Sequence, residues 1–534
     1  MKIKKICLIL AAVCGSVAYG MPDINNPMTR AVLEVYEQQL KENPEDYHIW
    51  LNRANEYYRN NEYMRALNDV DNALKFIPVK ETADRLMALS LRANIYLQTD
   101  RLNEALVDLN TIVSLDPTDY VAIYQRGNTL YSLGDYAAAK TDYQRLMRLN
   151  SRSAEGLVGL ARVAVKENNL GTANEMLEQA VANDPSNADL YVRRASVRRD
   201  MGNDQGAVED LIVALAVDSR NNRAMVMLIE YGRVNYPAVI AGLTNAMSQA
   251  PNVSMYPYLR AVIAQHHYHY KAALTDFRLI IDKNLDSYPG IWRSMAECLY
   301  AMGRFEEALT EVDQALAKEP ASGESVLLRA KILRALGRNE DAKTQAARAV
   351  ALMPGRARAL NEMGLVYVSL EDYKQAAELF AESTLTAGDS PDAQESYLLR
   401  AWMLFGYLNQ PVAAKGFYEK VYEIAGEYPE SEKAQIYGCF GQAFAGNEAM
   451  SISSVESVLN SNRNNPYIQY LGACFYAQLD DFDKAYECAS RSLESGYANY
   501  YDWEYEKDAR VNVAPLRDDL RFLNLLDRYK HLWE

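Results

Sequence analysis

The sequence predicts an all-α solenoid, a stack of short paired helices, and three observations lead to this prediction. The chain has 534 residues, which is too many for one ordinary hydrophobic core. Its composition, with 49% hydrophobic and 24% charged residues, is ordinary for a folded protein. Alanine recurs at intervals of about 34 residues through most of the chain, and a fixed period of this length indicates a repeat architecture.

The N-terminal residues have the features of a secretory signal peptide. Three lysines lie within the first five residues, an apolar run follows over residues 6–13, and small residues end this region at Gly20. We therefore predict a signal peptide over residues 1–20, with cleavage near Gly20-Met21. Residues 21–46 are expected to form one capping helix before the repeats.

Cys14 leaves a second interpretation open, because a lipid on this cysteine would anchor the chain to a membrane. The residues before it match a lipoprotein consensus poorly, since Val13 stands where a small residue is preferred. The apolar run is too short to span a bilayer, and no later segment is long and apolar enough to do so.

Each 34-residue interval has the same internal order. A helical stretch carries a bulky residue, a small one and often Tyr, as in Trp50, Ala54 and Tyr57. A turn residue such as Gly134 follows, then the recurring alanine, a large apolar residue four positions later, and often a proline. The recurring alanines are Ala66, Ala105, Ala139, Ala173, Ala207, Ala273, Ala308, Ala342, Ala376 and Ala485.

This spacing predicts two helices per interval. Small residues let the paired helices approach closely, and large ones at helical spacing give each helix one apolar face. Glycine permits a left-handed turn after the first helix, and proline ends the second. Helices of ~12–15 residues are marginal alone in water, so each pair needs its neighbours.

The order of residues resembles the tetratricopeptide-repeat (TPR) family, whose pattern of Trp, Leu-Gly, Tyr, Ala, Phe, Ala and Pro is matched in part by nearly every copy. The resemblance covers about residues 47–495. It implies a right-handed superhelical solenoid of helix–turn–helix repeats in an exported bacterial protein.

The repeats divide the chain into segments. A first array of about five repeats is expected, then a degenerate repeat, a second array of about four repeats, a degenerate helical region, a final repeat and a capping tail like that of many bacterial TPR proteins. The boundaries are 47–221, 222–253, 254–392, 393–465, 466–495 and 496–534.

Motifs that carry catalysis are absent from the sequence. There is no GxxxxGK[ST] nucleotide loop, no HExxH and no GxSxG. Three of the five histidines cluster at His266, His267 and His269, which we interpret as a solvated turn rather than a metal site. We predict no enzyme activity, no cofactor, no metal and, from the net charge of −15, no nucleic-acid partner. Cys474 and Cys488 fall on the two helices of one repeat, so a disulfide remains open.

The TPR resemblance implies that the first helix of each pair lines a concave groove. On that face the first three repeats carry Asn55, Asn94 and Asn128. An amide offers a donor and an acceptor, which suits an extended peptide backbone. The alternative is that these asparagines form only a solvated polar face.

The next two repeats carry a basic patch on or beside the same stripe. In an acidic chain, such a patch suits an acidic peptide or an anionic glycan. The alternative is pairing within the chain, with neighbours such as Asp189 and Asp200. The basic residues are Arg162, Lys166, Arg193 and Arg199.

Together these features predict a non-enzymatic scaffold for protein or peptide binding in the cell envelope. We expect it in the periplasm or at the periphery of the outer membrane after signal cleavage. The alternative function is that of an outer-membrane-associated glycan-binding accessory protein.

Overall fold

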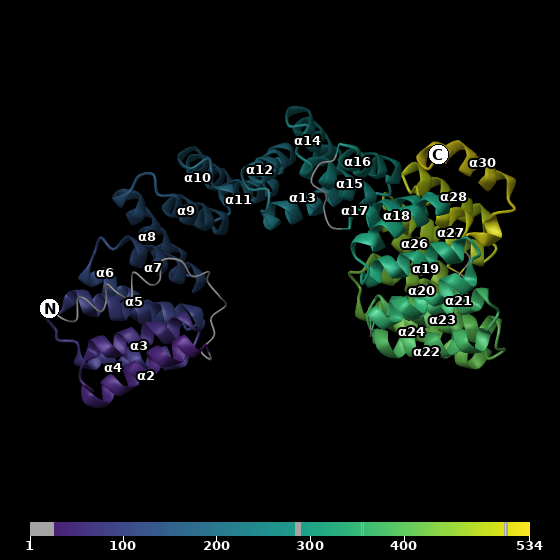
Figure 1. The fold of residues 1–534 in the computed structure, drawn as a ribbon. Helices are drawn as coiled ribbons and strands as arrows, with labels where there is room; N and C mark the ends of the chain where they lie inside the picture. Colours follow the sequence, from purple (N-terminus) through teal and green to yellow (C-terminus); the bar gives the residue numbers. More distant parts are fainter. Residues whose placement is uncertain (1–25, 284–289, 354, 356, 507, 509–510) are drawn as a thin grey trace. The chain divides into compact units, whose positions relative to one another are not determined.

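The structure, a computed structural model, describes residues 26–283, 290–353, 355, 357–506, 508 and 511–534, and all regular secondary structure in these residues is helical (Figure 1). The predicted signal peptide, Cys14 and the Gly20-Met21 cleavage site lie outside the described residues. The chain divides into two compact units, of which unit 1 ends at Asn221 and unit 2 begins at Asn222. The predicted all-α solenoid of helix–turn–helix repeats is confirmed.

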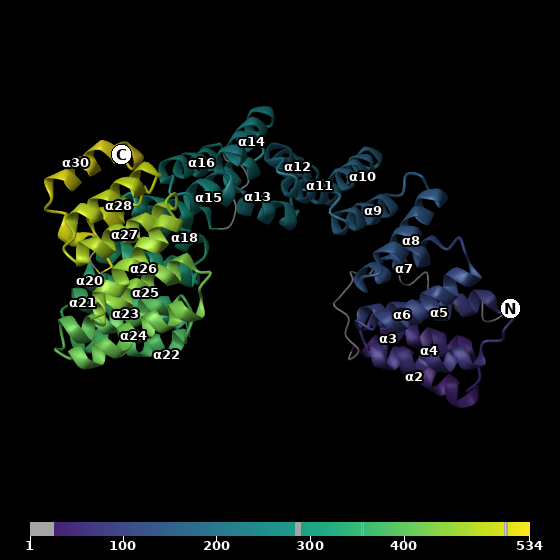
Figure 2. The ribbon, with the colours of Figure 1, turned by 180° about the vertical axis from the view of Figure 1, so that it is seen from behind.

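Unit 1 consists of helix α2 followed by five hairpins, each made of a first and a second helix. Its helices are α2 (Pro27–Glu42), α3 (Tyr47–Arg59), α4 (Tyr63–Phe76), α5 (Thr82–Gln98), α6 (Leu102–Leu115), α7 (Tyr120–Ser132), α8 (Tyr136–Leu149), α9 (Ala154–Lys166), α10 (Leu170–Asn183), α11 (Ala188–Asp200) and α12 (Asp204–Val217). Successive hairpins stack side by side, as both ribbon views show (Figures 1 and 2).

Unit 2 contains eight hairpins and a C-terminal region of short helices. The hairpin helices are α13 (Asn222–Val234), α14 (Tyr236–Gln249), α15 (Met255–His266), α16 (Tyr270–Asp282), α17 (Ile291–Ala301), α18 (Phe305–Lys318), α19 (Gly323–Ala335), α20 (Asn339–Leu352), α21 (Ala357–Ser369), α22 (Tyr373–Ala387), α23 (Ala393–Gly406), α24 (Pro411–Glu427), α25 (Glu432–Phe444), α26 (Glu448–Ser461), α27 (Pro466–Gln478) and α28 (Phe482–Glu494). The C-terminal elements are α29 (Tyr500–Glu504), η1 (Ala514–Leu516), α30 (Leu520–Tyr529) and η2 (Lys530–Leu532).

Every hairpin except α13–α14 turns on one residue in the left-handed conformation. At the α7–α8 turn this residue is Gly134, and the next amide, of Asp135, donates back to the carbonyl of Leu130 at 2.9 Å. That bond satisfies a carbonyl at the helix end. The turn residues are Asn61, Asp100, Gly134, Asn168, Gly202, Tyr268, Gly303, Gly337, Glu371, Asn409, Gly446 and Asp480. Glycine is therefore not required at each turn, because Asn and Asp also tolerate this conformation.

Close packing between hairpins depends on small residues in the first helices. The ring of Tyr143 in α8 is fully buried between Gly127 of α7 and Gly159 of α9. A Cβ atom on Gly159 would lie 2.3 Å from Cδ1 of Tyr143, so the ring fits only because the residue is glycine. The same ring thus contacts its own hairpin and the next one, which transmits the stacking along the unit.

A buried ion pair joins the two helices of five hairpins. In each, an arginine of the first helix donates two hydrogen bonds of 2.5–2.9 Å to an aspartate sixteen residues later. These aspartates are only 1–3% exposed. The pairs are Arg53–Asp69, Arg92–Asp108, Arg126–Asp142, Arg194–Asp210 and Arg260–Asp276. In hairpin α9–α10 the apolar residues Leu160 and Met176 take the corresponding positions.

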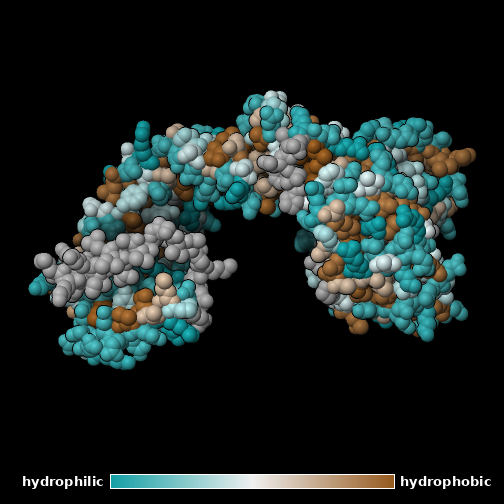
Figure 3. All heavy atoms as spheres, viewed as in Figure 1, coloured by the Kyte–Doolittle hydropathy of each residue, from teal (hydrophilic) through white to brown (hydrophobic). Residues whose placement is uncertain are grey.

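On the face drawn in Figure 3, hydrophilic residues predominate in both units and apolar residues form small groups. None of the described helices is long and apolar enough to cross a membrane.

Candidate functional site

The three asparagines predicted to line a groove lie half-buried on the first helices of unit 1. Asn55 in α3 donates from Nδ2 to the carbonyl of Leu51, one turn earlier, at 3.0 Å. Asn94 in α5 accepts a bond of 2.7 Å from Nε2 of Gln125 in α7. These contacts tie α5 to α7 but leave Asn55 bonded within its own helix.

Asn128 in α7 continues the connection to the next hairpin. Its Oδ1 accepts from the hydroxyl of Tyr143 at 2.9 Å and from Nη1 of Arg162 in α9 at 3.0 Å. The structure therefore brings Asn94, Asn128 and Arg162 into a ladder of polar contacts across α5, α7 and α9. Neighbouring repeats hold each of these side chains in place.

The ladder fixes which atoms of the asparagines remain available. In Asn94 and Asn128 the carbonyl oxygen Oδ1 is occupied, while Nδ2 has no hydrogen-bond partner among the described residues. A free amide nitrogen donates two hydrogen bonds and pairs with carbonyl oxygens. The sequence predicted a donor and an acceptor at each position. The structure presents donors at Asn94 and Asn128, whereas at Asn55 the bonded atom is Nδ2.

The predicted basic residues differ in their surroundings. The guanidinium of Arg162 lies 4.0 Å above the centre of the Tyr131 ring, and Lys166, at the exposed end of α9, forms no ion pair within the described part of the chain. Arg193 pairs with Asp189 at 2.5 Å, and Arg199 pairs with Asp200 at 3.2 Å. The pairing alternative therefore holds for these two arginines. Exposed pairs of this kind contribute about 1 kcal/mol at most, so they leave both arginines able to bind an anion.

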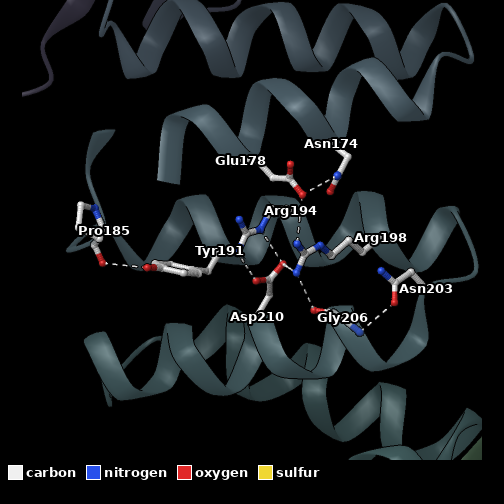
Figure 4. Close-up of polar contacts among 9 residues, drawn as sticks. All are labelled: Asn174, Glu178, Pro185, Tyr191, Arg194, Arg198, Asn203, Gly206 and Asp210. Atoms are coloured by element: carbon white, nitrogen blue, oxygen red, sulfur yellow. Dashed lines mark hydrogen bonds and ion pairs between the residues drawn. The ribbon is translucent and has the colours of Figure 1, made fainter. Parts of the chain in front are cut away.

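Arg194 and Arg198, which are next to the patch in the sequence, serve a different purpose (Figure 4). Both bind Asp210 of α12, and Arg198 also reaches Glu178 of α10 at 3.4 Å and the carbonyl of Gly206 at 3.3 Å. They lie between α10, α11 and α12, so they hold the repeats together. The repeated Arg-x15-Asp spacing in the sequence marks such arginines as structural.

Unit 2 contains a cavity of about 340 Å³, partly open to solvent, that the sequence analysis did not predict. Its walls come from the first helices of six successive hairpins, α17, α19, α21, α23, α25 and α27, and from the C-terminal region. The charged lining residues are Lys331, Arg334, Arg358, Glu362, Glu395, Asp502, Glu506 and Asp508, and the lining tyrosines are Tyr300, Tyr437, Tyr467, Tyr470 and Tyr501.

One wall of this cavity is formed by residues 496–506 and Asp508, which we call the tail segment. It follows α28 and extends to hairpins near the start of unit 2. The ring centre of Tyr497 lies 4.7 Å from that of Tyr268, and that of Tyr501 lies 4.6 Å from that of Tyr300. Figures 1 and 2 both show the yellow C-terminal residues beside α18. No local sequence pattern reveals this contact, because it joins residues more than 170 positions apart.

An ion pair closes the contact between the tail segment and the repeats. Arg334 in α19, whose side chain is 11% exposed, binds Glu362 of α21 at 2.8 Å and Asp508 of the tail segment at 3.1 Å. Burial disfavours the charged guanidinium, but Glu362 and Asp508 outweigh it and raise the pKa of Arg334. Arg334 therefore stays charged between two carboxylates.

Other acids of the tail segment are less well compensated. Burial raises the pKa of Asp502 to about 6, although a hydrogen bond from Tyr497 and the charge of Lys331 oppose the shift. Burial and the charge of Asp508 raise the pKa of Glu506 well above its ordinary value. The docked tail segment thus keeps acidic groups where ionisation is costly.

The histidine cluster differs from the predicted solvated turn. His266 is exposed, but the rings of His267 and His269 pack on Tyr236, with ring centres 4.6 and 4.8 Å away. His267 Nε2 also lies 2.6 Å from the carbonyl oxygen of Gly232. The prediction is therefore wrong for two of the three histidines, because they fill space between hairpins α13–α14 and α15–α16.

The four cysteines that the structure describes form no disulfide and belong to no metal site. Cys298, Cys439, Cys474 and Cys488 are buried and free, so Cys474 and Cys488 are not joined. Burial raises the pKa of Cys439 and of Cys488 to about 12. In the ranges that the structure describes, no group of three His, Cys, Asp or Glu side chains is placed to hold a metal ion.

Comparison with known proteins agrees with the repeated hairpins. The family model of the tetratricopeptide repeat matches residues 124–173, 158–223, 294–359 and 327–393, which fall in both units. These matches show that the chain contains tetratricopeptide repeats over residues 124–223 and 294–393. TPR proteins bind protein or peptide partners.

Individual TPR relatives match only part of the chain. The DnaJ homolog subfamily C member 7 homolog of Schizosaccharomyces pombe is 26% identical over 185 residues, which cover 32% of this chain and 39% of that protein. Cellulose synthase operon protein C of Pseudomonas fluorescens is 29% identical over 135 residues, covering 23% of this chain and 11% of that protein. The chain thus spans well under two thirds of either relative.

A solved structure also matches part of the chain. The crystal structure of YrrB, described as a TPR protein with an unusual peptide-binding site, has 23% identity and a TM-score of 0.30. The alignment covers 36% of this chain and 98% of that one.

Proposed function

We propose that the chain is a non-enzymatic bacterial scaffold that captures a protein or peptide segment in the cell envelope through the first-helix face of unit 1. The supporting observation is the polar ladder, which turns the free amide nitrogens of Asn94 and Asn128 into fixed donors. Donors held by neighbouring repeats lose little conformational entropy when a ligand binds.

The geometry favours an extended segment as ligand. Packed helices lie 8–10 Å apart and an extended chain rises about 3.3 Å per residue, so roughly three residues of ligand would pass each repeat. Its carbonyl groups would accept from Asn94 and Asn128. An acidic side chain further along would meet Arg162, Lys166 and Arg199.

Replacing the asparagines tests this assignment. The triple variant Asn55→Ala, Asn94→Ala and Asn128→Ala should keep the helical circular dichroism of the wild type but capture less partner from envelope extract after crosslinking. Asn94→Asp with Asn128→Asp should weaken capture at least as much, because it replaces donors with acceptors. The matched control is Asn68→Ala with Asn183→Ala, two exposed asparagines on second helices. Equal capture by all variants in quantitative mass spectrometry would sink the assignment.

The location in the envelope is part of the proposal and rests on residues 1–20. We expect the mature protein to begin at Met21 and to fractionate with the periplasm or the outer membrane. N-terminal sequencing of the native protein tests the cleavage site. Labelling with a radioactive fatty acid, compared with Cys14→Ser, tests the lipoprotein alternative.

The second candidate function is that of a glycan-binding accessory protein of the outer membrane. One relative bears the name of a cellulose synthase operon, although it matches only 23% of this chain. Calorimetric titration with cello-oligosaccharides and with envelope glycans measures this function directly. Heat of binding that persists in the triple asparagine variant would favour it over capture of a peptide by unit 1.

A further inference from the structure

We propose that the concave face of unit 2 over α17, α19 and α21 is a second peptide-binding surface, occupied in this structure by the chain's own tail segment. Its external partner is an acidic, tyrosine-rich protein segment that takes the place of the tail segment when the contact opens. This surface is independent of the groove proposed in unit 1.

Two sets of contacts hold the tail segment, and they differ in kind. On its inner side Trp503 is fully buried against Tyr470 and Phe522, with ring centres 4.9 and 6.0 Å away. Arg517 donates to the carbonyls of Trp503 and Glu506 at 2.9 and 2.7 Å. These bonds join the tail segment firmly to the last hairpin and to α30.

The outer side of the tail segment meets the earlier hairpins through rings and one ion pair. Tyr501 and Tyr505 face Phe305, with ring centres 6.1 and 5.1 Å away, and Asp508 pairs with Arg334. The described residues show no backbone hydrogen bond between the tail segment and α17–α19. The outer contact is therefore the one that opens, while the inner contact keeps the tail segment on the last hairpin.

Charge complementarity defines the chemistry of the partner. The α19 and α21 wall presents Lys331, Arg334 and Arg358, while the tail segment presents Asp502, Glu506 and Asp508. Within the wall, Arg334 also binds Glu362, and Arg358 also binds Glu324. Lys331 has no hydrogen bond or ion pair within the described residues, so a positive charge remains available at the cavity. A segment that combines carboxylates with tyrosine rings satisfies the same wall that the tail segment satisfies.

The fit of the tail segment is incomplete, which leaves room for exchange. A cavity of about 340 Å³ remains between it and the first helices. Its only helix, α29, has five residues, far fewer than an isolated helix needs to be stable. Burial also disfavours ionised Asp502 and Glu506 there, so a partner with better-placed acids can compete.

A matched pair of glycines tests whether the contact opens. Gly303 and Gly337 both end first helices with φ of +74° and +73°. A Cβ on Gly303 would lie 3.0 Å from Tyr500 of the tail segment, whereas one on Gly337 meets nothing within 4 Å. Gly303→Asn therefore inserts a wedge under the tail segment. Gly337→Asn carries the same backbone change without the wedge, and Asn tolerates this conformation.

The probe is a fluorescent synthetic peptide with the sequence of residues 496–508, added to the full-length chain. We expect Gly303→Asn to bind it at least about tenfold more tightly than the wild type or Gly337→Asn do, by fluorescence anisotropy. Hydrogen exchange of α17 and of the tail segment should rise in Gly303→Asn only. A peptide with Asp502, Glu506 and Asp508 replaced by Asn, Gln and Asn should lose most of this binding.

A second variant covers the case in which Gly303→Asn fails to fold. Asp508→Asn removes the carboxylate through which the tail segment binds Arg334, but leaves Glu362. Like Gly303→Asn, it should increase binding of the peptide. Lys331→Gln, added to the Gly303→Asn or Asp508→Asn variant, should weaken binding of the peptide. The control is Lys318→Gln, at an exposed lysine, in the same variant. The proposal is overturned if exchange rises without peptide binding, if neither changes, or if the neutralised peptide binds equally well. Partner capture by unit 1 is measured separately, so either proposal can fail alone.

Discussion

Arg126 and Asp142 illustrate how one residue pair supports a repeat. Their bidentate contact is nearly dry, and Arg126 also reaches Asn110 of the preceding hairpin at 3.2 Å. Breaking such a pair leaves an uncompensated buried charge, whereas replacing both partners by apolar residues is often nearly neutral. The chain contains its own apolar version, Leu160 and Met176, in the next hairpin.

Substitutions that copy this apolar version give a test. Asp142→Met alone should lower the free energy of unfolding by about 3–5 kcal/mol, because it strands the guanidinium of Arg126. The double variant Arg126→Leu, Asp142→Met should recover most of the loss. Urea denaturation followed by circular dichroism measures both. A double variant as unstable as the single one would show that the ion pair itself stabilises the hairpin, and that its partners do more than neutralise each other's buried charge.

Asp502 gives a prediction of pH dependence. Its pKa is raised in the folded chain to about 6, so the folded state binds the proton more tightly than the unfolded state does. Its contribution to stability is therefore largest at low pH and decreases as pH rises from about 4 to about 6. The two-unit pKa difference limits the effect to about 3 kcal/mol, and partial exposure reduces it further.

Asp502→Asn should remove this part of the pH dependence. The variant should exceed the wild type in unfolding free energy at pH 7, and the advantage should vanish near pH 4. Paired urea titrations between pH 4 and pH 7.5 measure it. A constant difference across this range would contradict the assignment to Asp502.

For single residues, the sequence predicted the helix on which each residue lies better than it predicted the side chains to which it bonds. Helical phase placed Asn94 and Asn128 on first helices, and the structure describes them there. Whether Oδ1 or Nδ2 is free depends on Gln125, Tyr143 and Arg162, which come from other helices. These partners depend on how neighbouring helices stack in three dimensions. The hydrophobic periodicity of a single helix does not predict that stacking.

Hairpins are the level at which sequence is most informative in this chain. Recurring alanines and turn residues locate most first and second helices, because a tight turn and close packing restrict residue type locally. The exceptions are turns such as that of Tyr268, whose φ of +62° is unusual for an aromatic residue. There the ring of Tyr497 packs against Tyr268. A contact with a residue far along the sequence thus stabilises the strained backbone of this turn.

The same substitution should have opposite effects in a turn and in a helix. Gly446, with φ of +99°, and Gly416, inside α24, both have no heavy atom within 4 Å of a built Cβ. Gly446→Ala should destabilise unit 2 by about 1 kcal/mol through backbone strain. Gly416→Ala should stabilise it by about 0.5–1 kcal/mol through lost freedom of the unfolded chain. Thermal unfolding of the two variants checks the signs, and equal signs would refute the argument.

The two units differ in how far their contacts reach. In unit 1 the hairpins pack on their sequence neighbours, as in other repeat arrays, and the periodic sequence predicts this arrangement. In unit 2 Arg334 meets Asp508, 174 residues later. The tail was predicted as a cap for the last hairpin, and α30 does pack on α28. Its reach to α17–α19 has no periodic signature, so the repeat pattern could not predict it.

Hydrogen exchange should reveal this difference. Asp142→Met in unit 1 should speed exchange in α7, α8 and α9 and much less in α3 and α4, because coupling in a repeat array decays with distance. Trp503→Ala in unit 2 should speed exchange at both α17 and α27, since the tail segment joins them. Uniform exchange changes across unit 1, or a change at α27 without one at α17, would contradict this view.

The long reach of Arg334 to Asp508 also sets an order in time. A ribosome adds roughly 5–20 residues per second, so Asp508 emerges roughly 10–35 s after Arg334. Each hairpin of unit 1 completes its contacts as soon as the next hairpin is made, but the concave face of unit 2 has to wait until residues 496–508 have been made. Every new molecule therefore passes through a period in which α17, α19 and α21 are complete and their own tail does not yet exist.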